Sequence, residues 1–177
     1  MKRRILIGLM IIITFCMITG CTKKEEKKEK NSEMKSSIQL EEGAFSIVCN
    51  SKVSDSDGIS SENETTYNFN ENQYVKNYAV VTTQSFKDES VYRIYKETQE
   101  ETVKASSNEE ILYDLQSNDK TKSLVFTMAV IDINIEDAET EEEKESLKAK
   151  EILERLEGIT EVKYECELKN IDRSELK

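Results

Sequence analysis

The chain contains no histidine, no proline and no tryptophan among its 177 residues, and it has only five glycines and four cysteines. Without histidine, the Ser-His-Asp and Cys-His pairs of nucleophilic catalysis and the imidazole-based zinc sites are excluded. The glycines do not fall into the spacing of a phosphate-binding loop. Catalysis by two carboxylates stays open, because 36 residues are acidic.

The charge balance is strongly acidic, with a net charge of −11 at neutral pH. Hydrophobic residues make up 37% of the chain and charged residues 34%, so we expect a modest core. Long-range repulsion disfavours partners that carry phosphate, and we therefore expect no binding to nucleic acid. No cofactor is predicted.

The first twenty-one residues have the layout of a secretory signal. Three cations at positions 2–4 precede an uncharged, mostly apolar run over residues 5–18, and two small residues then lead to Cys21. A permanent transmembrane helix needs about 20 apolar residues. The uncharged run up to residue 20 offers only sixteen positions, so we predict a cleaved signal rather than a membrane span.

The end of this segment, Ile18-Thr19-Gly20-Cys21, resembles the lipobox of bacterial lipoproteins, although the family usually has leucine where Ile18 stands. The resemblance implies that residues 1–20 are removed and that Cys21 carries diacylglycerol. It also implies a protein anchored to the cell membrane by lipid and facing the outside of the cytoplasm. An ordinary signal peptide, or an uncleaved anchor that ends near a cysteine, is the alternative.

Residues 21–42 are predicted to form the lipidated cysteine and a disordered, charged tether. Residues 23–30 mix Lys and Glu in short blocks, and residues 31–37 have almost nothing to bury. A charged helix is the alternative, but it would have no apolar stripe to pack. Removal of residues 1–20 takes the net charge from −11 to about −14, so an anionic membrane should repel the domain while Cys21 holds it there.

Residues 43–177 are predicted to form one α+β domain. Period-two alternation and β-branched runs predict strands at residues 45–49, 67–69, 74–86, 111–116, 123–135 and 162–168. Apolar stripes of helical period predict helices at residues 88–104 and 140–158, and the polar stretch 51–64 is expected to be a loop. The order β-β-β-α-β-β-α-β favours a mostly antiparallel sheet with both helices on one face.

Several local signals refine this prediction. Asp88 is placed to cap the first helix, and Thr140 with Glu143 forms a capping-box pattern for the second. Gly158 is placed to end the second helix, while Leu147 lies off its apolar stripe. The strand at residues 123–135 is apolar on both sides and should therefore be interior to the sheet. In element order and size, the domain resembles the small YehR-like lipoproteins of unknown function.

The cysteines predict one disulfide. Cys16 leaves with the signal and Cys21 takes the lipid, which leaves Cys49 and Cys166 in a compartment that permits oxidation. Both lie on the apolar phase of predicted strands, so we expect them to point into the core and to join the first and last strands. Closing so long a loop could stabilise the domain by about 4 to 5 kcal/mol. Two free, buried cysteines are the alternative.

Two acidic clusters are candidate cation sites. Four residues match positions of a calcium loop: Asp55, Asp57, Gly58 and Glu64. Val53 stands where the first carboxylate is needed, so we interpret the match as chance. The second cluster, at residues 136–143, is expected from the helix macrodipole alone. No metal site is predicted.

Five tyrosines could line a surface for a peptide or glycan, or could fill the core, which we favour: Tyr67, Tyr74, Tyr78, Tyr92 and Tyr95. Two hypotheses of function follow. The preferred one is a non-catalytic module that binds a protein, a peptide or an envelope component outside the cytoplasmic membrane. The other is a carboxylate-dependent envelope hydrolase, which would require two convergent acids with raised pKa values.

Overall fold

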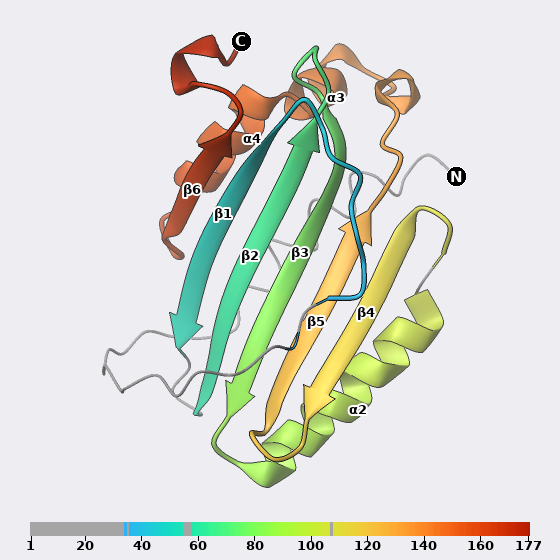
Figure 1. The fold of residues 1–177 in the computed structure, drawn as a ribbon, viewed down its shortest axis with the longest axis vertical. Coiled ribbons are helices and arrows are strands. Elements are labelled where there is room, and N and C mark those ends of the chain that lie inside the picture. The colour runs from blue at the N-terminus through green and yellow to red at the C-terminus, as the bar shows by residue number, and fades with distance from the viewer. Residues whose placement is uncertain (1–33, 35, 55–57, 107) are drawn as a thin grey trace.

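The structure, a computed structural model that describes residues 34, 36–54, 58–106 and 108–177, contains a six-stranded antiparallel sheet with helices on one face (Figure 1). The strand order is β4-β5-β3-β2-β1-β6. The elements of the described part are β1 (Phe45–Ser54), β2 (Ile59–Phe69), β3 (Val75–Phe86), α2 (Glu89–Ser106), β4 (Ile111–Asn118), β5 (Ser123–Val130), η1 (Ile135–Asp137), α3 (Glu141–Ser146), α4 (Ala149–Glu157), β6 (Tyr164–Lys169) and η2 (Arg173–Glu175). The predicted α+β class is confirmed.

The hairpin of β1 and β2 is longer than the sequence predicts. The two strands stay paired from Phe45 opposite Phe69 to Ser54 opposite Ser60, so most of the expected polar loop is strand. Polar side chains on the helix-facing side bond to one another across strands. Asn63 Nδ2 donates to Ser51 Oγ (3.4 Å), and Thr82 Oγ1 donates to Asn63 Oδ1 (2.8 Å). The loop prediction was wrong because cross-strand pairing, and not apolar alternation, stabilises this part of the sheet.

Strand β5 is shorter than predicted but lies between β3 and β4, as its apolar character on both sides suggested. Leu124 on one face and Ala129 on the other are both 0% exposed. The strand ends at Val130, and Asp132 follows with a φ of 54°, a left-handed conformation that breaks the ladder. Residues 131–134 are therefore a connection and Ile135 begins η1, whereas the sequence predicts a strand up to residue 135.

The second predicted helix is two helices, α3 and α4. The capping box of α3 forms as predicted, because Thr140 Oγ1 accepts from the Glu143 amide at 3.1 Å. The helix then breaks, because the Leu147 carbonyl accepts from the Val75 amide (3.0 Å) at the start of β3. This break turns Leu147, which lay off the apolar stripe, into the core, where it is 6% exposed.

Both helices cover the same face of the sheet, at opposite ends (Figure 1). The larger core cluster includes the apolar stripe of α4 and the inward side chains of β1 and β2: Phe45, Ile47, Cys49, Tyr67, Phe69, Ala149, Ile152, Leu153 and Leu156. A smaller cluster joins α2 to the far end of the sheet: Ile59, Phe86, Tyr92 and Leu124. The predicted arrangement of both helices on one face is confirmed.

Three of the five tyrosines are core residues. Tyr67, Tyr78 and Tyr92 are 4%, 2% and 1% exposed, and the rings of Tyr67 and Tyr78 lie 5.4 Å apart. The preference for a core role is therefore confirmed for these three. Burial raises the pKa of Tyr67 to about 12, and burial also raises the pKa of Tyr78.

We expect the free energy of unfolding to fall as the pH rises from about 10 to about 12. An unfolded tyrosine ionises near pH 10, whereas Tyr67 keeps its proton to about 12, so in this window the unfolded state binds fewer protons and is increasingly favoured. Urea unfolding across this range measures the decline, and Tyr67→Phe should make it shallower. An identical decline in the variant would contradict the prediction.

Candidate functional site

The open face of the sheet, which points away from α2 and α4, is the candidate site. Its middle is buried although both helices lie on the other side, and the buried residues there are small or β-branched: Ala79, Val125, Thr127 and Ala129. Toward the C-terminal end of β1, the open face is polar and exposed, with an ion pair between Lys52 and Glu62. Something other than a helix therefore covers the middle of this face.

That cover is the strap, residues 36–44, which crosses the open face before the chain enters β1 (Figure 1). At one end, the Ser37 amide donates to Asp114 Oδ2 on β4 (2.9 Å). At the other end, the Ala44 amide donates to the Phe69 carbonyl on β2 (2.8 Å). The sequence assigns residues 36–42 to the tether. In the structure these residues lie on the sheet instead. Every second side chain of the strap is half-buried there, at Ser36, Ile38 and Leu40, and the residues between them are exposed.

Two buried amides hold the strap in the middle. Asn68 on β2 and Asn77 on β3 are registered partners, and Asn68 Nδ2 donates to Asn77 Oδ1 at 2.8 Å. Each of the two Nδ2 atoms also donates to the main-chain carbonyl of Glu41, at 3.1 Å from Asn68 and 3.0 Å from Asn77. Loss of this carbonyl without a substitute would leave buried donors unsatisfied, at a cost of about 1 to 3 kcal/mol per group.

A charge contact accompanies these bonds. Lys76 Nζ forms an ion pair with Glu41 Oε2, and this hydrogen bond is the main reason why the pKa of the Glu41 carboxyl is lowered. Both groups are accessible to solvent, so the pair adds little to stability. We call Asn68, Lys76, Asn77 and Asp114 together the strap site.

A buried hydroxyl lies in the same part of the open face. Thr127 on β5 is 1% exposed and is registered opposite Asp114 on one side and Val81 on the other. Its Oγ1 is the buried side-chain polar atom that lacks a hydrogen-bond partner within the described ranges. Buried hydroxyls are normally satisfied, so this atom marks a place where the strap does not complete the polar contacts of the face.

Gly43 lets the strap turn into β1. A Cβ atom at this position would lie 2.4 Å from the Phe69 carbonyl oxygen and 2.7 Å from the Phe69 nitrogen. Backbone atoms cannot move aside as a flexible side chain can, so only glycine allows this close approach. The geometry of the strap therefore depends on a glycine at its end.

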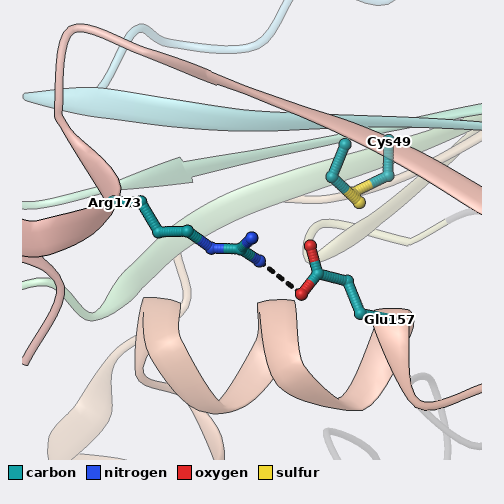
Figure 2. The surroundings of a disulfide bond; sticks show 4 residues. Cys49, Glu157 and Arg173 are labelled. Carbon is teal, nitrogen blue, oxygen red and sulfur yellow. Dashed lines mark hydrogen bonds and ion pairs between the residues drawn. A yellow bond between two sulfur atoms is a disulfide. The ribbon is translucent and has the colours of Figure 1, made fainter.

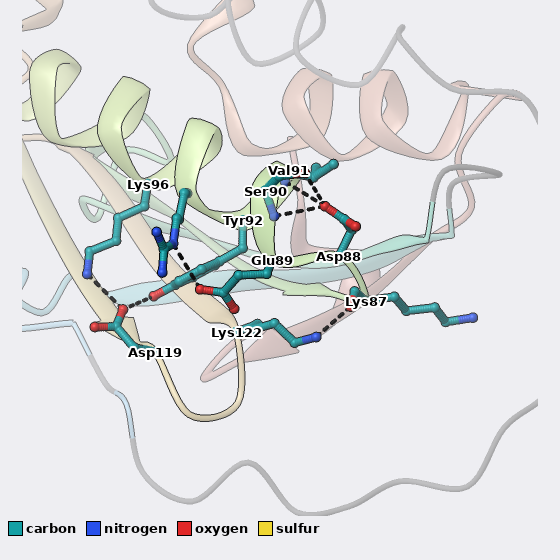
Figure 3. A network of polar contacts seen from close by, with 10 residues as sticks. Lys87, Asp88, Glu89, Ser90, Val91, Tyr92, Lys96, Asp119 and Lys122 are labelled. Atoms are coloured by element: carbon teal, nitrogen blue, oxygen red, sulfur yellow. Dashed lines mark hydrogen bonds and ion pairs between the residues drawn. The ribbon is translucent and has the colours of Figure 1, made fainter.

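A second polar network ties α2 to the turn between β4 and β5 (Figure 3). The Asp88 carboxylate caps the first amides of α2, as the sequence predicts. Tyr92 Oη donates to Asp119 Oδ1 at 2.5 Å, and Lys96 Nζ donates to the same oxygen at 2.8 Å. These contacts position α2 on the sheet. The Asp119 carboxylate accepts hydrogen bonds from two side chains of α2, Tyr92 and Lys96.

The perturbed carboxyl groups do not resemble general acids. The pKa values of Glu41, Asp88, Asp119 and Glu165 are all lowered, in each case chiefly by a side-chain hydrogen bond to a neighbour. A general acid of a hydrolase needs the opposite shift, which burial or a second carboxylate would supply. These four carboxyls therefore serve capping and ion pairing.

Some residues predicted from the sequence lie outside the described residues, and these are Cys21, the signal segment, Asp55 and Asp57. Gly58 has a φ of 79° just before β2, and Glu64 lies within β2. The second acidic cluster falls in η1, α3 and the residues between them, where Glu143 completes the capping box. In the described part of the chain, no three His, Cys, Asp or Glu side chains gather as metal ligands.

The sequence did not single out the four residues of the strap site or Thr127. Asn77 and Thr127 each interrupt the apolar run of a predicted strand, and a polar residue in an interior strand needs a partner. That signal is present in the sequence, but it does not say which segment provides the partner.

The comparisons with known proteins identify no family. No family model and no curated protein sequence matches the chain. Among solved structures, the chain is similar to an NMR structure of a protein from Streptococcus pneumoniae TIGR4, with a TM-score of 0.31 and 17% identity. The match covers 72% of this chain and 84% of that one. A similarity this low supports no inference about function. Across the described ranges, no helix has the length and apolar character that crossing a bilayer requires.

Cys49 and Cys166 form a disulfide, the pairing that the sequence predicts (Figure 2). They are registered partners on β1 and β6, with Cα atoms 4.0 Å apart. Cys49 is 0% exposed and belongs to the core cluster under α4, whereas Cys166 is half-buried. The ion pair between Arg173 and Glu157 lies nearby and joins η2 to the end of α4. The covalent bond thus fixes the edge strand β6 to the sheet.

Replacing both cysteines of this pair by alanine should lower the free energy of unfolding by about 2 to 5 kcal/mol, because the unfolded chain is no longer restricted by the cross-link. Urea unfolding measures the change. Reductant should lower the stability of the wild type to a similar value and leave the Cys49→Ala/Cys166→Ala variant unaffected. A wild type that is insensitive to reductant under unfolding conditions would contradict the prediction.

Proposed function

We propose that this chain is a lipoprotein held at the outer side of the cytoplasmic membrane by diacylglycerol on Cys21. The observation that carries the proposal is the sequence Ile18-Thr19-Gly20-Cys21 directly after a basic and then apolar segment. The disulfide between Cys49 and Cys166 supports it, because structural disulfides persist in oxidising compartments and are rare in the cytosol.

We further propose that the domain is a non-catalytic binding module for a protein, peptide or envelope component. The open face supports this role, because its side chains hold an extended stretch of polypeptide through specific hydrogen bonds. The alternative, a carboxylate-dependent envelope hydrolase, gains no support from the four carboxyls with lowered pKa values. The proposal involves no cofactor, and the acidic net charge argues against nucleic acid as a partner.

The position of the strap is compatible with an anchored domain. Fourteen residues lie between Cys21 and Ser36, where the strap begins. Fully extended, such a stretch reaches at most about 50 Å. The proposed anchor therefore keeps the open face within this distance of the membrane surface.

Cys21→Ser should abolish lipidation. Mass spectrometry of the membrane fraction should find an acylated Cys21 and no peptide from residues 1–20 in the wild type. The variant should leave the membrane fraction or remain as an uncleaved precursor. Cys16→Ser is the matched control, because this cysteine lies inside the removed segment and should be processed normally. A mature N-terminus at another residue, without acyl modification, would refute the proposal.

A further inference from the structure

We propose that the open face is a binding site for an extended segment of another polypeptide, and that the strap occupies this site in cis. The inference rests on the proposed function as a binding module and names the class of its ligand. It follows from three features of the strap site: what it contacts, how it selects charge, and how loosely the strap is held.

The strap site binds main-chain atoms. Asn68 and Asn77 donate to one carbonyl, and Asp114 accepts from one amide four residues earlier in the strap. These donors and acceptors match the groups that every extended peptide presents. A segment from another chain can therefore make the same three hydrogen bonds.

Side chains add a sequence preference. Ile38 and Leu40 are half-buried, while Ser37, Gln39 and Glu41 between and after them are exposed. The alternation directs Ile38 and Leu40 toward the sheet, whose open face is apolar between the two anchor points at Ala79 and Ala129. Lys76 then selects a carboxylate at the next position. The expected ligand has two apolar residues at alternate positions, followed directly by an acidic residue.

The strap is held less firmly than the face that it covers. Residues 36–44 are all exposed or half-buried, whereas Asn77, Thr127 and Ala129 beneath them are at most 2% exposed. Ala44 makes the one backbone-to-backbone bond between strap and sheet that occurs in the described part. A segment with few buried contacts opens at a lower free-energy cost than the buried elements of the core.

Thr127 indicates that the strap is an incomplete occupant. Its buried hydroxyl has no partner among the described residues, although it lies beside Asp114, which holds the strap. A ligand that offers a polar group to this hydroxyl would satisfy it and gain affinity over the strap. This second observation is independent of the hydrogen bonds at Asn68 and Asn77.

Binding of a peptide in trans tests the inference. The probe is a fluorescein-labelled peptide with the sequence of residues 34–43, added to the full chain in detergent and followed by fluorescence anisotropy. In the chain, Ile38→Asp/Leu40→Asp should release the strap, because two carboxylates cannot pack on an apolar face. We expect this release variant to bind the peptide at least tenfold more tightly than the wild type, whose own strap competes.

Matched controls identify the site. The same two substitutions in the peptide should abolish its binding, and Asn77→Leu in the release variant should weaken binding at least tenfold. Arg93→Ala, on the exposed side of α2, should change nothing. If circular dichroism shows that the release variant is unfolded, Gly43→Ala replaces it, since a Cβ atom at this position would clash with the Phe69 backbone and displace the strap. Faster hydrogen exchange of the Ser37 amide verifies release.

A folded chain with a released strap that binds the peptide no better than the wild type would overturn the inference. This outcome is distinguishable from failure of the proposed function. An acylated Cys21 without peptide binding would leave the lipoprotein assignment intact and remove only the peptide ligand. Peptide binding by a chain with unmodified Cys21 would retain the site and remove the anchor.

Discussion

The structure depends on a constraint that follows from its sheet, whose interior strands are apolar on both faces while helices cover only one. Leu124 and Ala129 are each fully buried on opposite sides of β5. Apolar surface left in water would cost about 25 cal/mol per Å², so the open face needs a cover of its own. The strap supplies it with a short segment that is neither helix nor strand.

A cover of this kind is held differently from a helix. The helices α2 and α4 are fixed by buried apolar side chains that belong to the two core clusters. The strap is fixed by side-chain hydrogen bonds to its main chain and by an exposed ion pair. Hydrogen bonds of this type contribute about 1 kcal/mol each, and another chain can replace them. The same hydrogen bonds therefore hold the strap over the open face and allow another chain to replace it.

The disulfide has a complementary role at the opposite edge of the sheet. Strand β6 is short and pairs with a single neighbour, β1, and its outward residues Glu165, Glu167 and Lys169 are charged and exposed. Charged side chains protect an edge from pairing with other chains but add little to its stability. The bond from Cys49 to Cys166 holds this edge covalently. The disulfide thus fixes β6 to the sheet, whereas the strap covers β3, β5 and β4 and is held loosely.

Much of the fold could be predicted from local pattern. Alternation located the strands, Asp88 and the pair Thr140 and Glu143 located helix starts, and the phase of Cys49 and Cys166 indicated a shared core. These predictions succeeded because each rests on a contact between residues close in the sequence, or on the burial of a single residue. The same reasoning failed for residues 51–64, where polar residues pair across a hairpin without an apolar alternation. It also failed for the helix break at Leu147, whose carbonyl accepts from Val75, a residue distant in the sequence.

By itself, the sequence determined the α+β class, the placement of both helices on one face and the acidic surface, since these follow from composition and period. Only the tertiary structure decided that residues 36–42 lie on the sheet, and that Asn68, Asn77 and Asp114 converge on one stretch of main chain. Convergence of this kind depends on strand register, which brings together residues far apart in the chain. The local pattern of the sequence does not predict which segment will lie over these three side chains.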